Sequence, residues 1–136
     1  MEQSYLIELI QTLSSAEKNQ ILRFSEIPFF NSGRMRSSVG PFLEICLQHP
    51  WEKEPLDKLT LYNAIFPNQD FVEGKLEKVM VEAHKVVRAF LLAQNYFSAD
   101  NDFQMTLDFA EIVRLRGLDA RFQQSLAKMQ KIQAEF

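Results

Sequence analysis

Histidine, cysteine and clustered acidic residues are the side chains from which reaction centres and metal sites are usually built, and this sequence has few of them. His49 and His84 fall in different predicted elements, and neither has a cysteine or a second histidine at ligand spacing. Cys46 is the only cysteine and lies on an apolar helix face without a basic neighbour that would lower its pKa. We therefore expect packing or surface roles for the histidines and a buried, inert thiol at Cys46.

Asp100 and Asp102 flank Asn101 in a pattern similar to the start of a calcium loop. The glycine and the terminal glutamate that such a loop requires are absent, so helix capping explains these side chains better. The sequence also has no glycine-rich phosphate loop and no serine in a nucleophile elbow. We predict no catalytic residue, no metal and no cofactor; an enzyme completed by residues beyond position 136 is the alternative that stays open.

The composition and net charge of the chain argue against nucleic-acid-binding, membrane-binding and secreted proteins. The 136 residues are 46% hydrophobic and 24% charged, which is typical of one globular domain, and the formal charge is −3. No global positive field would therefore attract nucleic acid or an anionic membrane. A single cysteine rules out an internal disulfide, and the acidic start Met1-Glu2 does not resemble a secretory signal. We expect a cytoplasmic protein with no membrane partner.

Apolar residues recur every three or four positions along nearly the whole chain, which predicts an all-α fold. Ser14 and Glu17 have the spacing of a capping box, Pro41 suits a first helical turn, and Gly117 suits a helix end. Pro28 disfavours helical geometry at Ile27, so 27–33 is predicted to be irregular. The expected helices are about 5–13, 15–26, 41–47, 56–66, 74–97, 101–116 and 118–136.

These helices predict an orthogonal bundle over 1–98, with 74–97 as its long central helix. A helical hairpin over 100–136 is expected to pack on the end of that helix, so that both form one continuous domain. In the hairpin, the first helix is apolar on two sides, with Ala110 and Val113 on one and Phe109 and Ile112 on the other. Such a helix is expected to be sandwiched.

The last helix carries alanines at seven-residue spacing opposite its larger apolar residues: Ala120, Ala127 and Ala134. Small residues at this spacing let another helix approach closely, so the hairpin has the pattern of the first pair in a stack of helices similar to tetratricopeptide repeats. The alternative is that alanine simply favours a helix whose outer face is solvated.

Four segments between Leu13 and about Phe97 carry a family resemblance. They are Leu13-Ser14-Ser15-Ala16-Glu17 with Arg23-Phe24, the marker Pro28-Phe29-Phe30-Asn31, Leu61 to Pro67, and Leu76 to Leu91. This pattern resembles the N-terminal region of a bacterial family of long, largely helical proteins for whose members no activity is known. The resemblance implies a helical chain that continues past the present C-terminus, and it implies no catalytic residues.

The patterns together favour protein association by a scaffold or adaptor module. The expected contact surface combines two loop aromatics with the outer side of the last helix: Phe29, Phe30, Ala120, Ala127, Ala134 and Phe136. Three occupants stay open, namely a second copy, another protein, or a C-terminal continuation of the same chain.

DNA binding is the alternative hypothesis, because the helices 56–66 and 74–97 could form a helix-turn-helix unit. The expected contacts would be Arg34, Arg36, Lys75 and Lys78. Three interleaved acidic residues cancel most of the positive charge: Glu73, Glu77 and Glu82. The acidic balance of the chain therefore favours the protein-association hypothesis.

Overall fold

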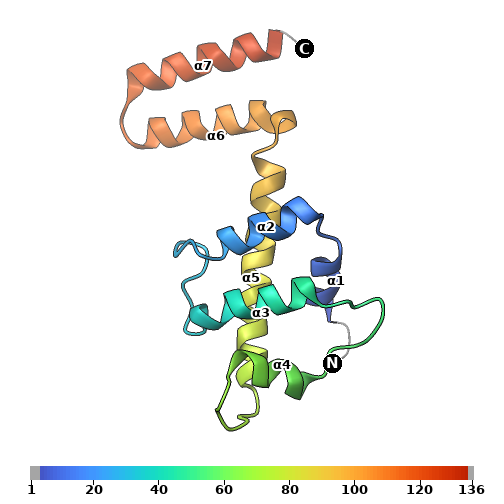
Figure 1. The fold of residues 1–136 in the computed structure, drawn as a ribbon. Coiled ribbons are helices and arrows are strands. Elements are labelled where there is room, and N and C mark those ends of the chain that lie inside the picture. The colour runs from blue at the N-terminus through green and yellow to red at the C-terminus, as the bar shows by residue number, and fades with distance from the viewer. Residues whose placement is uncertain (1–3, 135–136) are drawn as a thin grey trace. The chain divides into compact units, whose positions relative to one another are not determined.

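The computed structural model describes residues 4–134, and these residues form seven α-helices, one short 3-10 helix and no strand (Figure 1). The all-α prediction is confirmed. The elements are α1 (Tyr5–Gln11), α2 (Ser15–Phe24), α3 (Arg36–Gln48), α4 (Lys58–Ile65), α5 (Lys75–Tyr96), η1 (Ala99–Asn101), α6 (Asp102–Leu115) and α7 (Asp119–Ala134). They form two compact units, Met1–Phe90 and Leu91–Phe136, whose boundary falls within α5. Within residues 4–134, no helix combines the length and the apolar character that crossing a membrane requires.

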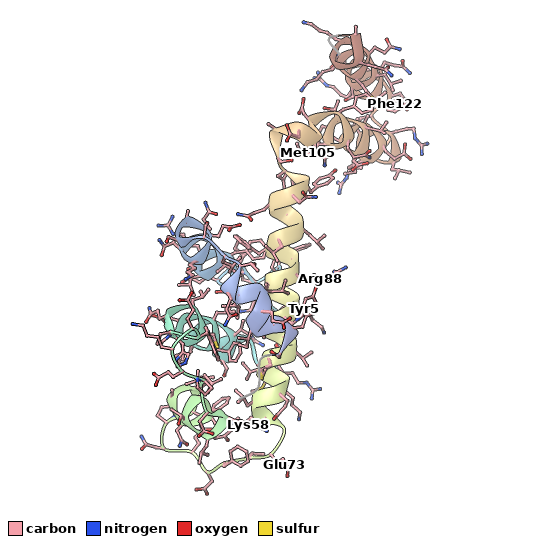
Figure 2. The ribbon with its side chains drawn as sticks, turned by 90° about the vertical axis from the view of Figure 1, so that its right-hand side faces the viewer. Tyr5, Lys58, Glu73, Arg88, Met105 and Phe122 are labelled. Atoms are coloured by element: carbon pink, nitrogen blue, oxygen red, sulfur yellow. The ribbon has the colours of Figure 1, made fainter. Side chains whose placement is uncertain are left out.

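The first unit is an orthogonal bundle organised on α5. Figure 1 shows α2, α3 and α4 crossing α5 at a steep angle, and Figure 2 shows the same three helices nearly end-on beside it. The helix α3 lies in the middle of this layer and contacts α1, α2 and α4. Its position explains why α3 contributes the largest share of fully buried side chains outside α5.

The core of this unit is made from the predicted apolar stripes. The stripe on α5 buries every third or fourth residue, as its 3.6-residue period requires. The largest side chains that are almost completely buried are Ile7, Ile10, Ile21, Val39, Phe42, Leu43, Leu61, Tyr62, Leu76, Val79, Val86 and Val87. Tyr62 also satisfies its hydroxyl, which donates to the carbonyl oxygen of Asp70 at 2.8 Å and accepts from the amide of Val72 at 3.1 Å. This pair of bonds holds the chain between α4 and α5 against the core.

The start of α2 is the capping box that the sequence predicts. The amide of Glu17 donates to Ser14 Oγ at 3.2 Å, and the amide of Ser14 donates to Glu17 Oε1 at 2.9 Å. Two amides that a helix start leaves without partners are thereby satisfied. The helix ends at Phe24, two residues before the predicted end, and Ser25 caps it with a hydroxyl that donates to the carbonyl oxygen of Leu22 at 2.6 Å.

The predicted start of the third helix at Pro41 is wrong, because α3 begins at Arg36 and Pro41 lies inside it. A proline within a helix removes one backbone hydrogen bond and crowds the preceding residue. The preceding residue is Gly40, which has no Cβ to be crowded, and Pro41 itself is exposed. The helix α3 therefore continues through Pro41, although the sequence pattern predicts that a helix begins at this proline.

The second unit contains the end of α5 and the predicted helical hairpin, formed by α6 and α7. The helices α6 and α7 pack on each other, and Gly117 between them has a φ of +77°, the left-handed conformation that glycine tolerates best. Only Ala110 and Val113 are fully buried among the described residues of α6 and α7. A hairpin with so little buried surface leaves much of its apolar surface in contact with water.

Candidate functional site

Cys46, His49 and His84 each contact neighbouring residues of the fold. Cys46 is completely buried, as predicted, and its burial raises the pKa of the thiol to about 12. His49 donates from Nε2 to the carbonyl oxygen of Glu54 at 2.9 Å, and the ring of His84 lies 5.4 Å from that of Tyr5. The part of the chain that the structure describes contains no group of three or more potential metal ligands. A thiol with so high a pKa is protonated at neutral pH and is a poor nucleophile.

The two loop aromatics that were predicted to form one contact surface have different environments. Phe30 stacks on Phe24 with ring centroids 4.4 Å apart, and Phe24 in turn meets the edge of Phe90 in α5 at 5.5 Å. Phe29 only touches the Phe30 ring from its outer side at 5.1 Å and remains 85% exposed. Phe30, which is 36% exposed, therefore anchors the loop to the core, whereas Phe29 leaves most of its ring in contact with solvent.

The rest of the loop is fixed by two polar side chains. The amide nitrogen of Asn31 donates to the carbonyl oxygens of Ser25 at 2.8 Å and Arg36 at 3.1 Å, which joins the end of α2 to the start of α3. Glu82, from α5, accepts the backbone amide of Met35 with both carboxylate oxygens, at 3.1 and 3.0 Å. A carboxylate at the first turn of α3 also interacts favourably with the helix dipole.

Gly33 permits the approach of Glu82 to the loop. A Cβ added at Gly33 would lie 2.0 Å from Oε1 and 2.4 Å from Cδ of Glu82, which is closer than any real contact. An alanine at this position would therefore displace the Glu82 carboxylate, while the backbone conformation of Gly33 itself sets no requirement. The hydrogen bond between Met35 and Glu82 joins parts of the chain 47 positions apart.

A groove of about 600 Å³ lies where α2, the loop and α3 meet. Asn31 and Arg36 line it beside two acidic residues, Glu26 and Glu44. Arg36 uses one guanidinium nitrogen to bond the carbonyl oxygen of Gly33 at 3.2 Å. The Oδ1 atom of Asn31 is buried and has no hydrogen-bond partner among the described residues. The lining mixes both signs of charge and does not by itself select a ligand.

The four residues of the DNA hypothesis come from the starts of two helices, α3 and α5. Arg34 and Arg36 flank the start of α3, where Arg36 bonds the loop backbone. Lys75 donates to Gln69 Oε1 at 2.7 Å and lies 4.1 Å from the Phe66 ring centroid, while Lys78 is exposed on the next turn of α5. The connection 66–74 is also longer than the three or four residues of a helix-turn-helix. These positions do not favour a DNA interface.

The second candidate surface is one side of α6, which we call the outer stripe. Residues seven apart lie on the same side of a helix, and two such series form this stripe: Asp102, Phe109 and Arg116 in one, and Met105 and Ile112 in the other, with Arg116 as the C-cap residue that follows the helix. Phe109 is 62% exposed and Ile112 is 48% exposed. The adjoining side of α6 buries Ala110 and Val113, and α6 packs on α7; Val113 follows Phe109 by four residues and therefore borders the outer stripe. Of the apolar residues in the outer stripe, Phe109 and Ile112 are therefore exposed, and Met105 is half-buried.

The alanine stripe of α7 lies on the surface. Ala120, Ala127 and Ala134 are all exposed, whereas Phe122, Leu126 and Met129 are half-buried on the opposite side of the helix. Phe136, which was predicted to extend this surface, lies outside the described residues. The stripe therefore presents small side chains, and a helix that packed there would approach closely.

A tyrosine pairs the end of α5 with α6 inside the second unit. The Tyr96 hydroxyl donates to the Asp108 carboxylate, and this hydrogen bond raises the pKa of Tyr96. Asn101 adds a second link, since its amide nitrogen donates to the carbonyl oxygen of Tyr96 at 2.9 Å. Figure 2 shows the neighbouring Met105 near the start of α6. The turn between the two helices is thus fixed by side chains rather than by apolar burial.

Sequence reasoning treated Glu82 only as a charge that cancels basic neighbours, and it missed the loop contact with Met35. It also missed the bond between Tyr96 and Asp108. The glycine in the loop, Gly33, was the one local signal that another group approaches closely. No protein-family model, curated protein or solved structure matches the chain. The family resemblance seen in the sequence therefore stays a prediction.

Proposed function

We propose that the protein is a scaffold or adaptor module of the cytoplasm that binds other protein surface through its C-terminal helical pair. The observation that carries this proposal is the outer stripe of α6, where Phe109 and Ile112 are exposed although they have helical spacing and apolar character. Large apolar side chains grouped on one side of a helix mark interaction surfaces more often than isolated ones do. Phe29 adds one exposed aromatic ring in the first unit.

Covering Phe109 alone would give a gain as large as that of a dominant interface residue. A phenylalanine side chain exposes on the order of 200 Å² in the unfolded chain, so the exposed part of Phe109 corresponds to a gain of roughly 3 kcal/mol if a partner covers it. That gain is typical of a residue that dominates an interface. The outer stripe thus has a central aromatic anchor with charged residues at both ends.

A photo-crosslinking amino acid placed at position 109 tests the proposal in living cells. We expect the full chain to form discrete adducts with protein when the label replaces Phe109. The matched control carries the label at Lys128, an exposed position of α7 away from both the outer stripe and the alanine stripe. Equal labelling from both positions would contradict the proposal.

A further inference from the structure

We infer that the occupant of the outer stripe is a second copy of this chain, bound through antiparallel pairing of the two α6 helices around a two-fold axis at Phe109. This inference rests on the proposed function and names the partner of the same surface. A surface that pairs with its own copy must be complementary to itself after a two-fold rotation. The order of residues along the outer stripe meets this condition.

The charges at the two ends of the stripe supply the complementarity. Asp102 lies seven residues before Phe109 and Arg116 seven residues after it, which is about 10.5 Å in each direction at 1.5 Å per residue. Antiparallel pairing at Phe109 therefore places Asp102 of each copy opposite Arg116 of the other. Parallel pairing would instead place like charges together at both ends, which is unfavourable.

Both charged side chains are available for such contacts. Within residues 4–134, neither Asp102 nor Arg116 forms a side-chain hydrogen bond or ion pair. Their neighbours Glu111 and Arg114, by contrast, pair with each other on another side of α6. Asp102 at the first residue of α6 and Arg116 at its C-cap are thus the charges that such pairing would satisfy.

The apolar residues between these charges fit the same symmetry. Rotation about Phe109 brings the two Phe109 rings together at the axis. Met105 of each copy then lies beside Ile112 of the other, about one turn from the axis on each side. This is the seven-residue pattern from which paired helices build an apolar seam. One helix against one helix buries less than a standard interface, so we expect a weak dimer that forms at high micromolar concentration.

Analytical ultracentrifugation of the full chain, up to several hundred micromolar, tests the inference through exchanged charges. We expect the single variants D102R and R116D each to weaken dimerisation about tenfold, because each replaces two attractive pairs by two repulsive ones. The double variant D102R/R116D restores attraction at both ends and should return to within about threefold of the natural chain. The matched control is D100R, which adds an arginine near the start of α6 outside the stripe.

Three results would overturn the inference: a monomer at all concentrations, a dimer that F109S does not weaken, or a double variant as weak as the single ones. Circular dichroism of each variant shows whether the helices are retained. Phe109 is largely exposed, so F109S is expected to fold. Adducts from position 109 to a different protein, together with a monomeric chain, would remove the second copy as occupant and leave the proposed function standing.

Discussion

Substituting Gly33 by alanine tests how the loop before α3 is held. The added Cβ would lie 2.0 Å from Glu82 Oε1, so the carboxylate must move away. The group displaced is the end of a flexible side chain, and the backbone itself need not shift. The cost is therefore the loss of the bonds from the Met35 amide to Glu82.

The magnitude follows from the kind of bond that is lost. A backbone amide that donates to a charged carboxylate at a helix start contributes about 1–2 kcal/mol. In the E82A background this bond is already absent, and the atoms of Glu82 that the Cβ would meet are gone. There G33A should be neutral, or stabilising by up to about 1 kcal/mol because alanine restricts the unfolded chain.

Urea unfolding followed by fluorescence gives the comparison, since Trp51 is the only tryptophan and lies in the first unit. We expect G33A to lower the midpoint by roughly 0.5–1 M in the natural background and not in E82A. The difference between the two backgrounds measures the coupling of the two residues. An equal loss in both backgrounds would refute the reasoning, because it would place the cost in the backbone of Gly33.

Three further predictions concern single side chains. F30A should lower the free energy of unfolding by about 2–3 kcal/mol through loss of its contact with Phe24, while F29A should change it by less than about 0.5 kcal/mol, both measured by urea unfolding. D108N should lower the pKa of Tyr96 toward its ordinary value in an ultraviolet titration, and Y96F identifies the signal of this tyrosine. Because the folded pKa of Tyr96 is raised, the hydrogen bond stabilises the folded chain below the ordinary tyrosine pKa of about 10. This stabilisation is lost as the pH rises through the folded pKa. Cys46 should react with a thiol reagent only at the rate of opening of the first unit, and a reaction as fast as that of a free thiol would contradict its burial.

The helices are well predicted by the sequence where a long apolar stripe repeats. The period places the central helix at 74–97, and α5 runs from Lys75 to Tyr96. Both hydrogen bonds of the capping box between Ser14 and Glu17 are predicted, because the two residues are only three positions apart in the sequence. The start of α3 is not predicted, since it depends on Glu82, which is distant in the sequence. The spacing of residues within one helix cannot show a contact between residues as distant as Met35 and Glu82.

The candidate surfaces are predicted in part for the same reason. The two apolar sides of α6 follow from spacing, whereas the choice of which side contacts α7 is made by packing. The sequence analysis also groups Phe29 with Phe30, because the sequence does not show which of two adjacent loop aromatics packs on the core. The two rings differ in burial because Phe30 packs on Phe24, which contacts Phe90 of a different helix.

The segment Pro28-Phe29-Phe30-Asn31 shows how a motif can serve mainly the fold and still leave one residue for binding. Phe30 packs on Phe24, and Asn31 joins the end of α2 to the start of α3, so substitutions at either position are expected to act through stability. Phe29 contributes almost no burial, and the loop keeps its other contacts without it. A loss of protein binding in F29A at unchanged stability would therefore assign this ring to a contact surface, whereas the same loss in F30A would not.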